Sequence, residues 1–525
     1  MPAADPVAGA LHAALAPAGY GNYAVRQFYD ARAFMPFWLA ADGAPTDAAR
    51  ALLDWAGEAD RHALPATRYD TAGLDRRLER TDAAAAARLE LDLTRLFLEY
   101  ARDLASGLLE PGEISQELHV APPRPDPAGL LAMAAAARDV PGFLAGLAPQ
   151  DPGYFHLVRL YRDMREIADN GGWDEPVATG PTLRLGDRGP RVAQLRARLI
   201  ALGDLPPSEQ IATNEVMTDA GPRRNDPRVV DSALEAAVRR FQARHGLNTD
   251  GAVGPMTLAA LNTPAAERAE QIAVNLERMR WLNRDPGYRH VVINIPAFTM
   301  TLIENGTPRF TTRTVVGKAS RFRTPEFSDE LEHIVVNPFW NVPRSIATEE
   351  ILPALRQDPY YLGRQNMELV GTDMPPGLID WSTVTPGNFP GRIRQHPGPN
   401  NALGRVKFLF PNKYAIYMHD TPARRLFRHD RRDFSHGCVR LEDPIAFAHL
   451  LLSLQSNDPE ALFERLHASG SERWVNLEEP IPVYVTYRTA WIDEDGAWQF
   501  RADVYGRDQL VAAALRDAGA ALPEG

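Results

Sequence analysis

The chain contains one cysteine, Cys438, which lies in the hexapeptide SHGCVR at residues 435–440. A thiol attacks as its thiolate, so a nucleophilic cysteine needs a base or a positive charge nearby. The flanking His436 and Gly437 provide an imidazole and a backbone whose N–H groups can approach an oxyanion. These residue types in this order predict a cysteine nucleophile, although a lone cysteine without such neighbours is usually a small buried hydrophobic residue.

A second histidine, His419, is the candidate general base. It ends the segment YAIYMH, in which larger apolar residues alternate with the period of a β-strand. A base at the end of a strand is well placed to face a turn that carries the nucleophile. We therefore predict that His419 takes the proton of Cys438 and that backbone N–H groups of residues 436–438 hold the oxyanion.

The order of a histidine followed by Ser-His-Gly-Cys resembles the signature of the L,D-transpeptidase (YkuD-type) catalytic domain. Residues 397–412, PGPNNALGRVKFLFPN, are similar to the family's segment before its catalytic histidine, and residues 483–508 are similar to the tail of large bacterial members. The resemblance implies a β-rich catalytic domain over residues 265–510. It also implies that His419 and Cys438 are the catalytic pair.

Three residues near this pair are expected to support it. Many family members carry Gly-Thr or Ser-Thr after the histidine, whereas this chain has Asp420 and Thr421, so a supporting role for residue 420 carries over only if its backbone carbonyl orients His419. Ser435 belongs to the motif itself. Arg440 is suited to bind a substrate carboxylate bidentately, but a structural salt bridge would explain it equally well.

Four further residues are predicted to bind substrate. Tyr417 and Trp340 offer apolar walls for a peptide, although aromatic residues of this kind also occur in ordinary cores. Asn401 and Gly404 belong to the segment that resembles the family's region before the histidine.

The resemblance implies a reaction through a thioester. The donor would be a tetrapeptide stem of peptidoglycan, cut between diaminopimelate and the terminal D-alanine, and the acceptor an amine of a neighbouring stem. An L,D-carboxypeptidase or endopeptidase of the same fold would use the same residues with water as acceptor. A wall-binding protein without activity would leave the Cys438 motif unexplained.

Composition limits the other classes. The 525 residues carry a net charge of −11, whereas nucleic-acid-binding surfaces are basic, so no nucleic-acid partner is expected. His419, Asp420, His429 and His436 lack the compact spacing of zinc ligands, and we expect neither metal nor cofactor. No charge-free stretch is long enough to predict a stable membrane span. Protein partners and oligomeric state cannot be derived from the sequence.

The predicted location is the periplasm or cell envelope. A single cysteine excludes an internal disulfide and avoids spare thiols that would trap a reactive one in an oxidising compartment. The N-terminus lacks a basic segment followed by a long apolar one, so a signal peptide is expected to have been removed.

The first 180 residues are predicted to be a helical scaffold. They are rich in alanine, and Leu89, Leu93, Leu96 and Tyr100 recur on one face of a helix. The segment YAVRQFYDARAFMPFWLAADG resembles the N-terminal scaffold of large L,D-transpeptidases. This region contains no catalytic constellation.

Residues 181–264 predict a three-helix module. Pro190 and Pro255 suit first helical positions, Gly203 and Gly246 suit helix ends, and Ser232 with Glu235 forms a possible capping box. The module resembles the peptidoglycan-binding domain found beside wall enzymes. A role as a spacer remains the alternative.

The catalytic region is predicted to be β-rich. Residues 290–317 contain three short runs of branched and aromatic residues, which indicate antiparallel strands. The segment of about sixty-five residues at 341–405 is too long for an ordinary connection and predicts a capping insertion. Residues 511–525 are a C-terminal tail. The fold class is therefore multidomain α+β.

Overall fold

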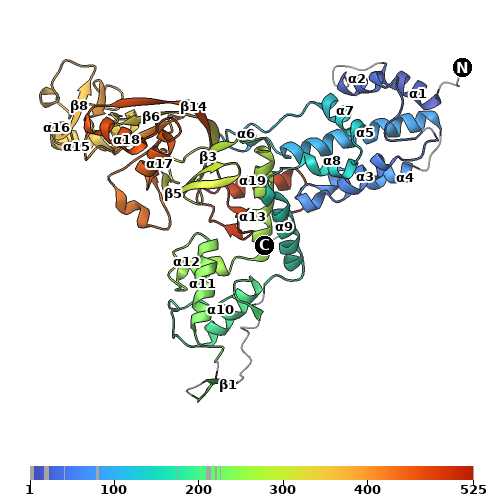
Figure 1. Cartoon of the computed structure of the whole chain (residues 1–525), viewed down its shortest axis with the longest axis horizontal. Helices are drawn as coiled ribbons and strands as arrows, with labels where there is room; N and C mark the ends of the chain where they lie inside the picture. Colours follow the sequence, from blue (N-terminus) through green and yellow to red (C-terminus); the bar gives the residue numbers. More distant parts are fainter. Residues whose placement is uncertain are drawn as a thin grey trace. The chain divides into compact units, whose positions relative to one another are not determined.

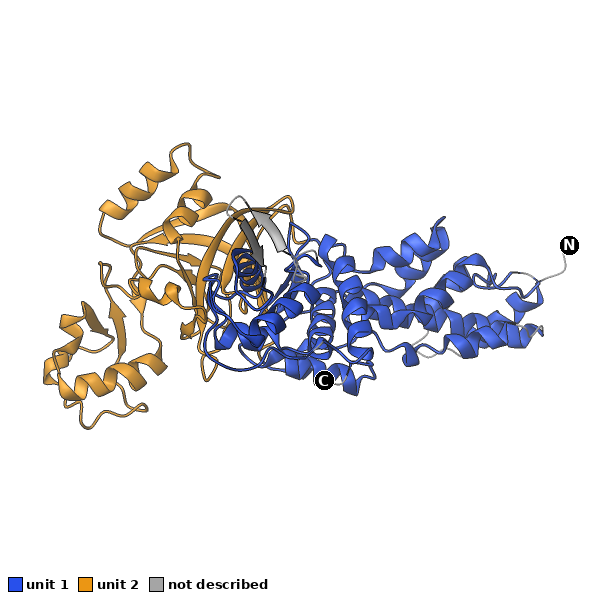
Figure 2. Ribbon diagram, turned by 90° about the horizontal axis from the view of Figure 1, so that it is seen from below, with its two compact units in different colours: residues 1–116, 120–285, 488–525 blue, residues 117–119, 286–487 orange. Residues whose placement is uncertain are grey.

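The computed structural model describes residues 5–16, 23–40, 42–78, 82–173, 175–207, 215–218, 221–224 and 226–523. The chain divides into two compact units (Figure 2). The first unit comprises residues 1–116, 120–285 and 488–525, and the second comprises residues 117–119 and 286–487. Residues 265–285 and 488–510, which we predicted as part of the catalytic domain, thus lie in the first unit.

The scaffold part of the first unit is helical, as predicted. Its helices are α1 (Pro6–Leu15), α2 (Tyr23–Ala31), α3 (Asp47–Gly57), α4 (Thr71–Arg77), α5 (Ala83–Ser106), α6 (Pro111–Ile114), α7 (Pro127–Ala136), α8 (Val140–Leu147) and α9 (Pro152–Asp169). Helix α13 (Ala265–Trp281) packs along α9, and α19 (Arg507–Asp517) packs on α13. Helices α1–α5, α7–α9 and α13 share one large apolar core.

Helix α5 organises the scaffold. Asp82 caps its first turn by accepting from the Ala85 amide, and the predicted apolar stripe from Leu89 to Tyr100 is buried. The same helix buries Glu90, whose carboxylate accepts from the Tyr29 hydroxyl at 2.8 Å and from the Trp38 amide at 3.0 Å. These hydrogen bonds compensate for the burial of the charge and tie α2 and the following loop to α5.

The predicted module forms three helices, α10 (Pro190–Ala201), α11 (Ser232–Arg244) and α12 (Pro255–Leu261), around a small core of its own. Proline stands at the first position of α10 and α12, as expected. The capping box at Ser232 was wrong, because Asp231 is the cap and accepts from the Leu234 amide at 2.8 Å. The polar insertion contributes β1 (Glu215–Thr218) and β2 (Gly221–Arg224), and residues 208–214, 219, 220 and 225 lie outside the described residues.

A C-terminal hairpin packs against this module. Strands β15 (Ala490–Ile492) and β16 (Trp498–Phe500) pair antiparallel. The guanidinium of Arg244 in α11 lies 3.6 Å from the centre of the Trp498 ring and pairs with the buried Asp204. This hairpin lies within residues 483–508, which we predicted to be part of the catalytic domain. In the structure it packs against the module instead.

The second unit is built on a nine-stranded sheet in the order β12-β5-β13-β11-β10-β6-β14-β3-β4. Strand β4 also pairs with β5, so the sheet closes on itself. Its strands are β3 (Arg289–Asn294), β4 (Thr299–Glu304), β5 (Thr307–Gly317), β6 (Phe327–Val336), β10 (Val406–Leu409), β11 (Met418–His419), β12 (Asp433–Ser435), β13 (Val439–Leu441) and β14 (Arg473–Thr486). The predicted antiparallel meander is confirmed for β3, β4 and β5.

Helices α17 (Pro444–Leu452) and α18 (Pro459–Ala468) accompany the sheet in this unit (Figure 1). Phe408 of β10 contacts Phe447 of α17, with ring centres 4.8 Å apart. Residues 117–119 join the same unit, because Leu118 bridges Glu326 and the His119 ring stacks on Tyr414 at 4.3 Å.

The segment at 341–405 is a small folded subdomain. It contains the three-stranded sheet β7-β9-β8, formed by β7 (Trp340–Asn341), β9 (Arg392–Gln395) and β8 (Met367–Val370), and the helices α14 (Arg344–Ile346), α15 (Leu352–Gln357) and α16 (Tyr361–Arg364). A separate apolar cluster around Leu355 and Trp381 holds it together. Within the described residues, no helix is long and apolar enough to span a bilayer.

Candidate active site

One face of the closed sheet is polar where β10, β11 and β13 run side by side. The register pairs Lys407 of β10 with His419 of β11, and His419 with Arg440 of β13. Residues paired directly across strands project from the same face, so these three side chains form a row. The opposite face of the same strands is buried and apolar, with Val406, Phe408, Met418, Val439 and Leu441.

The thiol lies beside this row. Met418 pairs with Val439, which sets Tyr417 opposite Cys438 one residue earlier in both strands. Alternation then directs Tyr417, His419, Cys438 and Arg440 to one face. The fold thus brings together the predicted nucleophile and the predicted base, although nineteen positions separate them in the chain.

His419 is 4% exposed and its orientation is fixed by one hydrogen bond. Its Nδ1 lies 2.5 Å from the backbone carbonyl oxygen of Asp420. Because a carbonyl only accepts, Nδ1 carries the proton and Nε2 keeps its lone pair. Burial, together with the charges of Arg440 and Lys407, lowers the pKa of His419 to about 3, and the Asp420 carbonyl opposes this only in part.

The carboxylate of Asp420 has a different task. It accepts from the Arg405 amide at 2.8 Å and from the Thr421 amide at 2.7 Å. Gly404 has a φ of +62°, and a Cβ at that position would lie 2.2 Å from the Asp420 carboxylate. Residue 420 therefore contacts the histidine through its carbonyl, while its side chain fixes the turn at residues 404–405.

The Cys438 thiol is protonated in the resting site. Burial raises the pKa of Cys438 to about 11, opposed by hydrogen bonds from the backbone and side chain of Tyr417 and by the charge of Arg440. The sulfur also contacts the carbonyl of Ala415 at 3.6 Å. A neutral thiol beside a neutral imidazole requires proton transfer to accompany attack.

The loop that carries Ala415 is strained and braced. Ala415 has a φ of 54°, which is unfavourable for a residue with a side chain. Asn412 holds the loop by donating to the carbonyl of Ile416 at 2.7 Å and accepting from its amide at 3.1 Å. The backbone that meets the thiol is therefore fixed from within the loop.

The Ser435 hydroxyl closes the turn before the thiol. It donates to the Cys438 carbonyl at 2.6 Å and accepts from the Gly437 amide at 3.1 Å. Gly437 has a φ of 113°, a conformation that favours glycine, and its carbonyl accepts from Thr324 at 2.7 Å. The Gly437 amide is therefore already engaged in this turn, and the oxyanion role of residues 436–438 stays a prediction.

His436 points toward the insertion. Its Nε2 lies 2.6 Å from the carboxylate of Glu350, and its ring packs against Phe322 with centres 4.5 Å apart. The two histidines of the motif therefore differ in environment, because His419 faces the thiol side of the sheet and His436 meets a surface carboxylate.

Comparisons with known proteins match three parts of the chain. The L,D-transpeptidase catalytic domain model (YkuD) matches residues 288–475, the putative peptidoglycan binding domain model matches residues 188–261, and the scaffold domain model matches residues 23–160. Residues 288–475 belong to the YkuD family. The YkuD domain contains the entire row from Lys407 to Arg440 as well as Cys438.

Two relatives match parts of the chain. A putative L,D-transpeptidase of Haemophilus influenzae is 35% identical over 246 residues, which cover 46% of this chain and 49% of that protein. The N-acetylmuramoyl-L-alanine amidase CwlM of Mycobacterium tuberculosis is 40% identical over 82 residues, covering 16% of this chain and 18% of the amidase. The chain thus spans about half the length of the first relative and less than a fifth of the second.

Solved structures of L,D-transpeptidases also match. The one from Stackebrandtia nassauensis is 14% identical, with a TM-score of 0.22, and covers 59% of this chain and 97% of its own. The one from Xylanimonas cellulosilytica is 16% identical, with a TM-score of 0.17, and the match covers 59% of this chain and 100% of that chain.

Arg440 of the YkuD domain has no ion-pair partner among the described residues. It is half-buried, and its Nε has no hydrogen-bond partner. Burial lowers the pKa of Arg440, and the nearby Cys438 and Glu350 raise it. The structural salt bridge raised as an alternative by the sequence is therefore not formed among the described residues, and the binding of a ligand carboxylate stays a prediction.

Two predicted substrate residues have structural surroundings instead. Asn401 is 1% exposed, and its side chain donates to the carbonyls of Pro338 and His396 and accepts from the Leu403 amide. Trp340 pairs with Gln395 in β7 and packs on the core of the insertion. The substrate-binding roles of these two residues and of Gly404 stay predictions.

Sequence reasoning missed Lys407 and Glu350. A lysine in the strand VKFL carried a weak signal, because a charged residue between buried positions of a strand faces a polar site or a partner. Glu350 could not have been found, since its partner His436 is eighty-six positions away. Only the folded insertion brings the two together.

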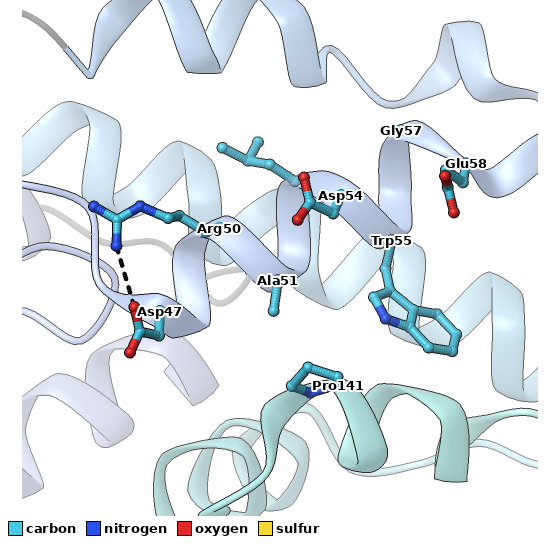
Figure 3. A pocket seen from close by; sticks show the side chains of 9 residues that line it. Asp47, Arg50, Ala51, Asp54, Trp55, Gly57, Glu58 and Pro141 are labelled. Carbon is cyan, nitrogen blue, oxygen red and sulfur yellow. Dashed lines mark hydrogen bonds and ion pairs between the residues drawn. The ribbon is translucent and has the colours of Figure 1, made fainter.

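Other features of the described residues do not compete with this site. No three His, Cys, Asp or Glu side chains among them gather as metal ligands. An open pocket of about 660 Å³ beside α3 is lined by Asp47, Arg50, Trp55 and other residues (Figure 3). Asp47 and Arg50 pair with each other at 3.1 Å. The pocket contains no nucleophile with a base, and we assign it no chemistry.

Proposed function

We propose that the YkuD domain is an L,D-transpeptidase that joins diaminopimelate residues of neighbouring peptidoglycan stems through a thioester on Cys438. The observation that carries this proposal is the free Nε2 lone pair of His419 on the same sheet face as the thiol. The donor is a tetrapeptide stem, and the acceptor is the amine of a second stem.

In the first half-reaction, His419 Nε2 takes the Cys438 proton as sulfur attacks the carbonyl between diaminopimelate and D-alanine. Amides of the motif and the Tyr417 hydroxyl stabilise the oxyanion. The carbon–nitrogen bond then breaks, and the imidazolium returns its proton to the leaving D-alanine amine. Arg440 binds a carboxylate of the stem.

In the second half-reaction, the acceptor amine attacks the thioester and loses a proton to His419. The carbon–sulfur bond breaks, and the departing sulfur recovers that proton. Water in place of the amine would give an L,D-carboxypeptidase or endopeptidase, which is the second candidate, because the same residues serve either acceptor.

The chain as a whole is proposed to act in the periplasm or cell envelope. The matched peptidoglycan binding domain supports retention on wall material, and no protein partner is proposed.

The test is mass spectrometry of purified wall fragments incubated with the full chain. The expected product is a cross-linked dimer with release of D-alanine, and only shortened stems would identify the hydrolase. Cys438→Ala should abolish product and also abolish the mass increase caused by a carbapenem. Product from a folded Cys438→Ala chain would overturn the mechanism, and an unreactive thiol in the unaltered chain would favour a binding protein.

A further inference from the structure

A buried lysine lies directly across from the proposed base. Lys407 of β10 pairs with His419 in the antiparallel register, and Arg440 of β13 pairs with His419 on the other side. Side chains directly opposite each other in a sheet have Cβ atoms about 5 Å apart. His419 is therefore flanked by one cation on each neighbouring strand.

The charge of Lys407 is held in place. Lys407 is 8% exposed, its Nζ lies 3.6 Å from the Glu472 carboxylate, and it lies 5.7 Å from the centre of the Trp474 ring. Glu472 is itself fixed, because it accepts from the Phe339 amide at 2.8 Å and from the Trp474 ring N–H at 3.1 Å. A buried lysine needs such a partner to keep its charge.

The carboxylates near these two cations act on the cations, because Glu472 pairs with Lys407 and Glu350 raises the pKa of Arg440. The groups that face His419 are Lys407 from β10, Arg440 and Cys438 from β13, and Tyr417 from its own strand. The Asp420 carboxylate is engaged by the amides of the turn, and Glu472 reaches the row only through Lys407.

We propose that Lys407, held by Glu472, is a positioning residue that keeps the His419 imidazole unprotonated and able to accept a proton in both half-reactions. The inference rests on the proposed function, in which His419 is the base. Like charges nearby disfavour the imidazolium form, and they equally disfavour an ammonium that approaches as acceptor. The two cations, Lys407 and Arg440, therefore favour an acceptor amine and a His419 imidazole that are both neutral.

The direct test is the titration of the His419 imidazole by NMR in the full chain, with the signal assigned through His419→Gln. Burial and Arg440 lower the pKa of His419 more than Lys407 does, so Lys407→Met should raise the midpoint of His419 by a fraction of a pH unit. Lys407→Arg should restore the unaltered behaviour.

Glu472→Gln keeps the lysine in place but removes its ion-pair partner, and a buried lysine without a carboxylate holds its charge less well. It should therefore raise the His419 midpoint in the same direction as Lys407→Met and by no more. The inference is overturned if Lys407→Met leaves the His419 midpoint where it lies in the unaltered chain, or if Glu472→Gln raises it further than Lys407→Met does. Carbapenem acylation of Cys438 is measured on the same samples, so its absence in the unaltered chain counts against the proposed function and not against the charge effect.

Discussion

The two histidines near the thiol, His419 and His436, are predicted to respond very differently to removal. Loss of a general base typically costs about 100- to 10,000-fold in rate. We therefore expect His419→Ala to lower kcat/KM by that factor, while His436→Ala, which removes a contact to Glu350, costs about tenfold or less. Steady-state kinetics of D-alanine release measures both variants. Equal losses, or the reverse order, would contradict the assignment of His419 as base.

A substitution at Asp420 can separate the role of its carbonyl from the role of its carboxylate, because the two groups have different partners. Asp420→Gly keeps the carbonyl that orients His419 but loses two hydrogen bonds to backbone amides. Unfolding by urea should show a loss of about 2 to 3 kcal/mol. The pH profile of the remaining activity should stay in place, and a displaced acid limb would mean that the carboxylate acts on His419.

At the scale of elements, the first helical segment of the insertion contacts two loops, one between β5 and β6 and one between β12 and β13. Residues 347–351 form a π-helical turn, in which the Leu352 amide donates to the carbonyl of Ala347 five residues earlier. Pro353, which lacks an amide N–H, follows within the next turn. The turn presents Glu349 to Arg321 at 2.6 Å and Glu350 to His436.

We expect the insertion at 341–405 to act as a mobile cap over the cleft. Exposed ion pairs contribute little, typically below about 1 kcal/mol, so they allow opening. Hydrogen exchange of the segment should be faster than that of β6 and β10 and should slow when Cys438 is acylated. The double variant Glu349→Gln and Glu350→Gln should speed exchange in residues 344–357 alone.

Leu355→Ala is the contrasting variant, because it weakens the core of the insertion and should speed exchange throughout the segment. Exchange as slow as that of the sheet in the unaltered free protein would make the segment a rigid structural part, and the gating role would have to be withdrawn.

At the scale of the whole molecule, the peptidoglycan binding domain is predicted to retain the chain on the wall without taking part in chemistry. Deleting residues 181–264 should weaken retention on insoluble peptidoglycan and leave carbapenem acylation of Cys438 nearly unchanged. Unaltered retention would favour a spacer. Lost acylation would mean that the module supports the catalytic fold.

The deletion has one structural side effect, since it exposes Trp498 of the C-terminal hairpin. Arg244→Ala tests that contact separately. It removes the ring contact and leaves the Asp204 carboxylate, which is 5% exposed, without its ion-pair partner. Breaking a buried pair costs about 3 to 5 kcal/mol, so calorimetry should show a clear loss of stability. Asp204→Asn should cost less, because it can still accept from Arg244.

The sequence by itself determined the parts that depend on local pattern. Spacing of apolar residues located α5, proline and glycine marked the ends of α10, α11 and α12, and the Ser-His-Gly-Cys motif identified the candidate nucleophile and base. The carbonyl of residue 420 was also named as the group that could orient His419. These features are local because they arise from backbone geometry and from neighbours close in the chain.

Only the tertiary structure decided which distant groups meet. The register of β10, β11 and β13 set Lys407 and Arg440 beside His419, and it could not be derived from separate segments, since a shift of one residue would turn every side chain to the other face. The packing of Trp340 on the core of the insertion, and the hydrogen bonds from Asn401 to the carbonyls of Pro338 and His396, likewise depend on the folded segment. Which side chains face the thiol depends on strand pairing, and pairing is fixed by burial across the whole sheet.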